Sequence, residues 1–144
     1  MIATNDGHEI PSSPITVEAI MEIQELNHVA LHVSDVEASC EFYHKVMQFD
    51  RLPRPAFSFP GAWFRLGEVQ ELHLIGGRLE DPIGGRRGNH YALLVEDLEP
   101  WIAHLDQHQL SFEGPLNRPD GATQVFFSDP DGHIIELCTK PPNL

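Results

Sequence analysis

The chain has 144 residues, 41% of them hydrophobic, which is enough to close one core and excludes two large domains. Its 22 acidic residues outnumber its 9 lysines and arginines and give a formal net charge of −13. A field of this sign repels phosphate backbones and anionic membrane surfaces, so we expect neither nucleic acid nor a membrane as a partner.

The first 25 residues form an N-terminal extension. We expect residues 1–14 to be disordered, whereas residues 15–25 fit either a short helix or an added strand. The start lacks the basic end and the apolar run of a secretory signal, and no stretch approaches the roughly 20 apolar residues that span a bilayer. We therefore expect a cytoplasmic protein in which Cys40 and Cys138 are buried free thiols.

A repeat organises the rest of the sequence. LNHVALHVSDVE at residues 26–37 is echoed by GNHYALLVEDLE at residues 88–99, so that His90 matches His28. Each copy begins as a strand of alternating character and then changes to the pattern of a helix. The repeat predicts two copies of one structural unit.

A helix follows the opening strand in each copy. Ser34 and Glu37 have the spacing of a capping box, and Asp97 is a favourable N-cap. Apolar residues then share one face of each helix: Val36, Cys40, Tyr43, Val46 and Met47 in the first, and Leu98, Ile102 and Leu105 in the second. These faces predict that both helices pack against a sheet.

Three short strands complete each copy, separated by turns rich in Gly, Pro and Asp. We expect strands near residues 48–52, 61–67 and 69–76, and again near residues 109–113, 122–128 and 133–139. The predicted fold is one α+β domain over residues 26–140. It contains βαβββ modules at residues 26–76 and 88–140, joined by a flexible linker at residues 77–87.

Four polar residues on the predicted strands are candidate metal ligands. His28 and His90 are equivalent in the repeat, and superposing the closing strands sets His73 against Glu136. Each lies among apolar neighbours, where a polar group is costly unless a partner or a metal satisfies it. Imidazole and carboxylate suit Zn²⁺, Ni²⁺, Fe²⁺, Co²⁺ or Mn²⁺. We expect one such ion per chain. Glu71, which lies on the same strand face as His73, is the alternative ligand at that position.

Other residues are candidates for contact with a substrate. His32 shares a strand face with His28, so it either touches substrate or packs in the sheet. Arg86 and Arg87 precede the second copy and either clamp an anionic group or belong to a solvated loop. Four aromatic residues either line a pocket or fill the core, which is the default: Trp63, Phe64, Tyr91 and Phe126.

Taken together, NHVALHVSDVEASCEFYHKVMQF, ELHL, NHYALLVEDLE and VFFSDPDGHIIEL resemble the vicinal oxygen chelate superfamily. This superfamily includes glyoxalase I, methylmalonyl-CoA epimerase, extradiol dioxygenases, and fosfomycin- and bleomycin-resistance proteins. The resemblance covers residues 26–139 and implies paired βαβββ units that form an open, cup-shaped mixed sheet around a metal. The ligand positions of the family fall on His28, His73, His90 and Glu136, in agreement with the repeat.

The resemblance also implies a chemistry. Enzymes of this family chelate a small substrate through adjacent oxygens and stabilise an enolate-like intermediate, and Glu136 is the candidate general base. We therefore expect a metal-dependent lyase or isomerase similar to lactoylglutathione lyase. Two positions depart from individual members: the second ligand of glyoxalase I is a glutamate where this chain has His73, and fosfomycin thiol transferases have a threonine where it has Ala30.

Two alternative functions fit the same resemblance. One is an extradiol-type dioxygenase, and the other is a non-enzymatic drug-binding protein of the bleomycin-resistance type, which needs no metal. Family members pair their units within one chain or across two chains, and the linker length fits both arrangements. We expect a homodimer.

Overall fold

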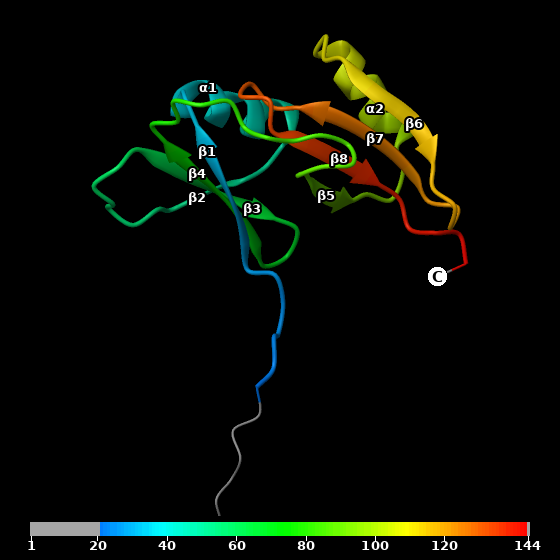
Figure 1. The fold of residues 1–144 in the computed structure, drawn as a ribbon, viewed down its shortest axis with the longest axis horizontal. Helices are drawn as coiled ribbons and strands as arrows, with labels where there is room; N and C mark the ends of the chain where they lie inside the picture. Colours follow the sequence, from blue (N-terminus) through cyan, green and yellow to red (C-terminus); the bar gives the residue numbers. More distant parts are fainter. Residues whose placement is uncertain (1–20, 144) are drawn as a thin grey trace, which may run out of the picture.

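A computed structural model of the protein describes residues 21–143. The first half contains β1 (His28–Val33), α1 (Val36–Glu41), the π-helical segment η1 (Phe42–Val46), β2 (Arg51–Leu52), β3 (Gly61–Leu66) and β4 (Gln70–Gly76). The second half contains β5 (Tyr91–Leu94), α2 (Glu99–Gln107), β6 (Phe112–Asn117), β7 (Thr123–Ser128) and β8 (Ile134–Cys138). The predicted order of strand, helix and three strands is confirmed twice (Figure 1).

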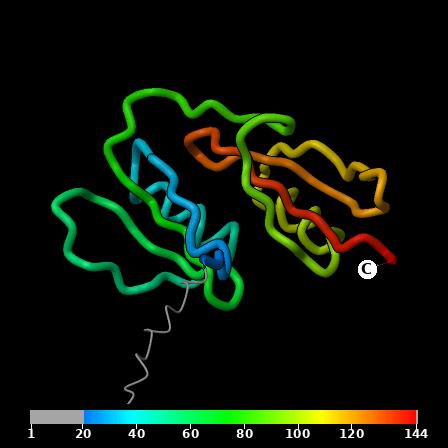
Figure 2. Tube along the Cα trace, turned by 60° about the horizontal axis from the view of Figure 1, so that its bottom comes forward, coloured from blue at the N-terminus to red at the C-terminus, as the bar shows by residue number. Residues whose placement is uncertain are grey.

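The strands form two mixed sheets of identical topology. Their orders are β1-β4-β3-β2 and β5-β8-β7-β6, and in each sheet one parallel pair lies beside two antiparallel pairs. The strands that carry the sequence repeat, β1 and β5, therefore occupy equivalent edges. Figure 2 shows the two sheets side by side, joined by the segment between β4 and β5.

One face of each sheet packs into a shared core. On β1, Leu31 and Val33 are buried while the alternating residues are exposed, as expected for a strand with one solvated face. α1 and η1 lie between the sheets and supply Phe42, Tyr43, Val46 and Met47 to the core, and α2 adds Leu98 and Leu105 (Figure 1). The opposite faces hold the candidate ligands.

Two tyrosines connect η1 of the first half to the second sheet. The hydroxyl of Tyr43 donates to Asp129 Oδ2 at 2.7 Å, and the hydroxyl of Tyr91 donates to that of Tyr43 at 3.4 Å. Burial raises the pKa of both tyrosines far above the usual value, so both stay protonated and act as donors. This network fixes the turn after β7 against η1.

A second contact between the halves centres on Asp131. Its carboxylate accepts hydrogen bonds from the backbone N–H of Ser34 at 3.0 Å, from the Ser34 hydroxyl at 2.7 Å and from Arg78 Nε at 3.0 Å. Although burial opposes the charged form, these bonds from Ser34 and Arg78 lower the pKa of Asp131. The DPDG turn, which precedes β8, therefore binds both the end of β1 and the segment that follows β4.

The structure corrects the predicted helix caps. Asp35, not Ser34, caps α1, because its carboxylate accepts from the backbone N–H groups of Glu37 and Ala38, both at 3.0 Å. The Ser34 hydroxyl is engaged by Asp131 instead. Asp97 lies one position before the N-cap of α2, yet it still accepts from the backbone N–H of Glu99 at 2.9 Å.

Two strands begin later than predicted, at equivalent places in the two sheets. β2 starts at Arg51 and β6 at Phe112, because Gln48 and Gln109 adopt positive φ angles of 58° and 57° that interrupt an extended chain. Residues 1–14 and most of residues 15–25, where disorder and a helix or strand were expected, lie outside the described residues; residues 21–25 have no regular secondary structure.

Cys40 and Cys138 are free, as predicted, but each is only partly buried. Burial raises the pKa of both thiols. None of the helices within residues 21–143 is long and apolar enough to cross a bilayer.

Candidate functional site

The first pair of predicted ligands meets on the exposed face of the first sheet. This surface, here called face A, is formed by His28, Ala30 and His32 of β1, Glu71, His73 and Ile75 of β4, and Trp63 of β3. The rings of His28 and His73 stack with centroids 4.2 Å apart. The parallel register of β1 and β4, which sets Ala30 opposite His73, brings the two imidazoles together.

Glu71 contacts the same pair. His73 Nε2 donates to Glu71 Oε2 at 2.7 Å, and Glu71 lies opposite His28 in the strand register. A carboxylate that accepts from one ring nitrogen fixes the other nitrogen as an available lone pair. Glu71 thus orients His73 in this structure, and the same position keeps it available as the alternative ligand.

The second pair lies on the equivalent face of the second sheet, here called face B: His90 and Ala92 at β5, Glu136 and Cys138 of β8, and Gln124 and Phe126 of β7. His90 Nε2 lies 3.0 Å from Glu136 Oε2. The other carboxylate oxygen of Glu136 accepts from Gln124 Nε2 at 2.5 Å. The Glu136 side chain is only 5% exposed, so these two partners replace the water it has lost.

The chemistry of these groups fits a divalent ion. His28 Nδ1 donates to Asn27 Oδ1 at 2.7 Å and His90 Nδ1 donates to Gly88 O at 3.0 Å, which leaves the lone pair of each Nε2 for a metal. Ligand atoms about 2.1 Å from one ion and at right angles lie about 3 Å apart. The separation of 3.0 Å between His90 Nε2 and Glu136 Oε2 matches that spacing.

The two pairs stay separate within one chain. Among residues 21–143, no three His, Cys, Asp or Glu side chains are grouped so that they could hold an ion together. One chain therefore presents two separate pairs of predicted ligands, His28 with His73 and His90 with Glu136, which are called half-sites below. That all four residues bind one ion remains a prediction, and it requires face A and face B to meet in a way that they do not within one chain.

The other predicted contacts are also on or near these faces. His32 is exposed on face A, where its Nε2 lies 3.2 Å from Gly76 O. Arg86 is paired with Glu113, with Nε and Oε1 3.1 Å apart, so its charge is already countered. Arg87 is exposed. Contact of these three residues with a substrate remains a prediction.

The aromatic residues divide between the core and the two faces. Phe64 is fully buried and Tyr91 packs against the core, as expected by default. On face A, Trp63 instead stacks on His73 with ring centroids 4.1 Å apart. On face B, the ring of Phe126 lies edge-on to that of His90, with centroids 5.7 Å apart.

Sequence reasoning missed Gln124. A signal was present, because alternation along β7 sets Gln124 and Phe126 on one face and the β7–β8 hairpin pairs Phe126 with Glu136. A polar residue two positions before Phe126 therefore falls diagonally beside Glu136.

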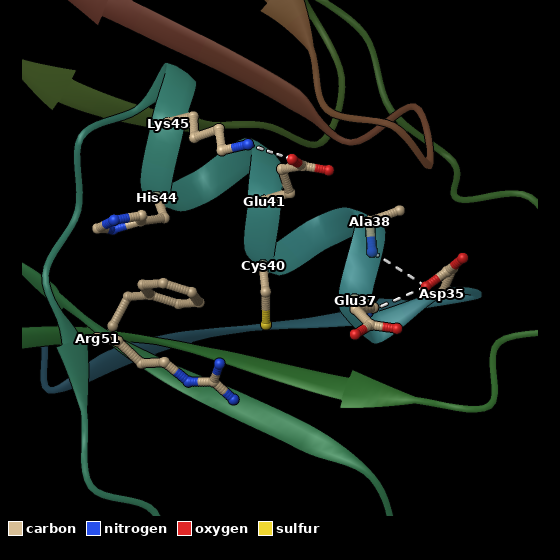
Figure 3. A pocket seen from close by; sticks show the side chains of 9 residues that line it. Asp35, Glu37, Ala38, Cys40, Glu41, His44, Lys45 and Arg51 are labelled. Atoms are coloured by element: carbon tan, nitrogen blue, oxygen red, sulfur yellow. Dashed lines mark hydrogen bonds and ion pairs between the residues drawn. The ribbon is translucent and has the colours of Figure 1, made fainter.

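A separate groove of about 750 Å³ lies on the helical side of the first sheet, between α1 and β2 (Figure 3). Cys40 points from α1 into it, toward the side on which Arg51 lies. None of the predicted ligands lines this groove. Another groove, of about 770 Å³, runs along β5 and does reach His90; its lining is largely apolar and includes Val29 and Leu94.

Comparison with known proteins agrees with the resemblance seen in the sequence. Residues 25–137 match the family model of the Glyoxalase/Bleomycin resistance protein/Dioxygenase superfamily. Glyoxylase I 4 of Arabidopsis thaliana is 29% identical over 126 residues, covering 82% of this chain and 72% of that protein. Glutathione transferase FosA of Serratia marcescens is 34% identical over 118 residues, covering 80% of each chain.

Solved structures show the same fold. The crystal structure of a putative glyoxalase family protein from Bacillus anthracis superposes with a TM-score of 0.71 at 24% identity, covering 85% of this chain and 99% of that one.

Proposed function

Since the chain belongs to the Glyoxalase/Bleomycin resistance protein/Dioxygenase superfamily, we propose that it is a divalent-metal-dependent lyase or isomerase acting on a small oxygenated substrate. The ligands would be His28, His73, His90 and Glu136. The observation that carries this proposal is the pairing of His90 with the buried Glu136, at a separation suited to two ligands of one ion. The bound ion would act as a Lewis acid that polarises substrate oxygens.

The complete site is assembled from two chains in this proposal. Face A of one subunit lies against face B of its partner in a homodimer, and two identical sites result from the twofold symmetry. Two features support this arrangement: each half-site is complete on one sheet, and β5 leaves Leu94 59% exposed beside the apolar groove that reaches His90.

Glu136 would move the proton. A general base must be held within hydrogen-bond reach of the proton that it accepts. Gln124 holds Oε1 of Glu136, which leaves Oε2 directed at His90 and at the substrate side of face B. The proton would pass from a substrate carbon beside a carbonyl to Oε2 and return to the neighbouring carbon.

Thiol transfer is the second candidate. FosA of Serratia marcescens, by its name a glutathione transferase, is 34% identical to this chain. The same half-sites would hold the ion. A thiolate would attack a carbon of an epoxide substrate, forming a C–S bond and breaking the C–O bond, and the released oxygen would then be protonated. Against this candidate, Ala30 provides no hydroxyl on face A beside His28.

The test combines metal loading with one substitution. Purified chain is offered Ni²⁺, Zn²⁺, Co²⁺, Mn²⁺ and Fe²⁺ and then assayed with hemithioacetals, acyl-CoA esters, catechols and thiol-plus-epoxide mixtures. We expect one ion per chain, and we expect Glu136→Gln to lower turnover by about 100-fold or more without loss of the fold. His108→Ala, at an exposed histidine on the end of α2, is the matched control and should behave as wild type.

Two outcomes would contradict the proposal. If Glu136→Gln turns over the identified substrate as fast as wild type, Glu136 is not the base. If none of the five ions binds while the chain still binds an aromatic drug, the protein sequesters ligands without catalysis.

A further inference from the structure

A continuous row of aromatic rings crosses face A. It starts at His28, continues through His73 on β4 and Trp63 on β3, and ends at Phe57 and Phe59 in the loop between β2 and β3. Trp63 and His73 are opposite each other in the antiparallel register and lie within 6° of parallel. The ring of Phe57 is 6.0 Å from that of Trp63 and 5.2 Å from that of Phe59. The row therefore links the first half-site to an outer loop.

The outer end of this row is exposed and held in place. Phe57 and Phe59 are 45% and 40% exposed, in a loop that contains Pro53 and Pro55 and ends at Pro60. Prolines restrict the backbone of the loop that carries the two rings, and contacts among the rings and Arg54 pack them against one another. Adjacent exposed aromatic rings beside a candidate site are a common feature of surfaces that bind ligands.

Arg54 places a positive charge at this outer end. Its guanidinium lies 4.7 Å from the Phe57 ring centroid and 4.9 Å from that of Phe59, and its Nη2 donates to Phe59 O at 3.0 Å. It rests on Gly61, where a Cβ atom would come within 3.1 Å of Nη2. The same Cβ atom would clash with the backbone oxygen of Leu74, so glycine at position 61 leaves room for both β4 and the guanidinium.

This charge has no carboxylate partner among residues 21–143, although the chain contains 22 acidic residues. The buried Nε of Arg54 also lacks a hydrogen-bond acceptor within the described part of the chain. By contrast, Arg78, Arg86 and Arg118 are each paired with an acidic side chain. Arg54 is thus a fixed cation at the end of an aromatic row.

We propose that face A binds a planar substrate that carries a carboxylate, an aromatic or conjugated acid. Its ring would lie against Trp63 and Phe57, with the carboxylate at Arg54 and the oxygens that react near His28 and His73. Stacking positions the ring, and the charge-assisted bond to guanidinium selects the anion. The placement of the reacting end rests on the proposed function, whereas the aromatic and anionic subsite does not.

The subsite is tested by a pair of matched probes in EDTA, so that no metal contributes to binding. Trp101→Phe leaves Trp63 as the single tryptophan, since the chain has two. In this background, quenching of Trp63 fluorescence is titrated with 4-nitrobenzoate and with the neutral 4-nitrobenzamide. We expect the anion to bind about tenfold more tightly than the amide, as a charge-assisted contact implies.

Substitutions then locate the contact. Arg54→Gln should abolish the preference for the anion, whereas Arg51→Gln, at an exposed arginine on the helical side of the sheet, should retain it. Circular dichroism and thermal melting check that both variants are folded. Equal binding of the two probes to the parent protein, or an unchanged preference in Arg54→Gln, would overturn the proposal.

This experiment separates the two proposals. A preference for the anion in a chain that binds none of the five metals would leave the subsite intact and refute the metal-dependent enzyme. Metal binding and turnover without any preference for 4-nitrobenzoate would support the metal-dependent enzyme and refute the anionic subsite.

Discussion

The hydrogen bonds of His90 require one more proton than a neutral imidazole and a carboxylate carry between them. Gly88 O accepts only, so Nδ1 of His90 must carry a hydrogen. The contact of 3.0 Å between Nε2 and Glu136 Oε2 then needs a second hydrogen between two groups that would otherwise both be acceptors. In the proposed site, a divalent ion bound by this pair would take the place of that proton.

Metal binding should therefore release protons. Calorimetric titration of Ni²⁺ or Zn²⁺ in two buffers with different ionisation enthalpies should report about one proton released per ion from this pair. The apparent affinity should also fall as the pH is lowered, because protons and the ion compete for the same lone pairs. In Glu136→Gln the released proton should disappear. Binding that is independent of pH would show that the ion does not replace this proton.

At this scale the sequence predicted the ligand candidates but not their surroundings. The repeat predicted that His28 and His90 are equivalent, since a duplication places matching residues on matching strands. Gln124 was missed because its role depends on pairing between β7 and β8, which alternation within one strand does not reveal.

Among the elements, the DPDG turn between β7 and β8 holds the two halves together. Asp131 is 2% exposed at its side chain and is bonded by Ser34 from the β1–α1 turn and by Arg78 from the segment after β4. Because its pKa is lower in the folded than in the unfolded protein, this carboxylate stabilises the fold above its unfolded pKa, about 3.9. The contribution is lost as the pH falls through the folded pKa.

Removing this charge should therefore change acid stability. Asp131→Asn should lower the free energy of unfolding at pH 7 by about 1–2 kcal/mol, because the charge-assisted hydrogen bonds to Asp131 are weakened while Arg78 keeps its contact with the exposed Asp81. Between about pH 5 and pH 2, the free energy of unfolding measured with denaturant should also change less with pH in this variant than in wild type. Asp106→Asn, at an exposed residue of α2, should retain the wild-type pH slope. Equal slopes in Asp131→Asn and wild type would contradict the role assigned to Asp131.

Order and type of the elements followed from periodicity, whereas their ends depended on longer-range contacts. Ser34 has the composition and spacing of a helix cap, but Asp131, far along the chain, binds its hydroxyl, and Asp35 caps α1 instead. Likewise, the left-handed conformations of Gln48 and Gln109 delay β2 and β6 at residues that are not glycine, so no local signal indicated them.

For the whole molecule, the arrangement of the two sheets determines what one chain can hold. The repeat predicted two equivalent pairs of candidate ligands that converge on one ion, and the structure brings His28 beside His73 and His90 beside Glu136, but sequence alone gave no rule for how the two faces meet. The shared core around α1 and η1 occupies the faces opposite the ligands, so the half-sites remain apart within the chain. In the proposed homodimer, a complete site would combine face A of one subunit with face B of the other.

Complementation between inactive variants tests this directly. His28→Ala/His73→Ala removes one half-site, and His90→Ala/Glu136→Gln removes the other. Equal amounts are dissociated and reassociated, and native mass spectrometry of a tagged subunit verifies that mixed dimers form. Random pairing makes half of the dimers mixed with one intact site each, so bound metal and turnover should recover to about a quarter of the wild-type level. Mixed dimers that bind no more metal than either variant alone would contradict a site shared between chains.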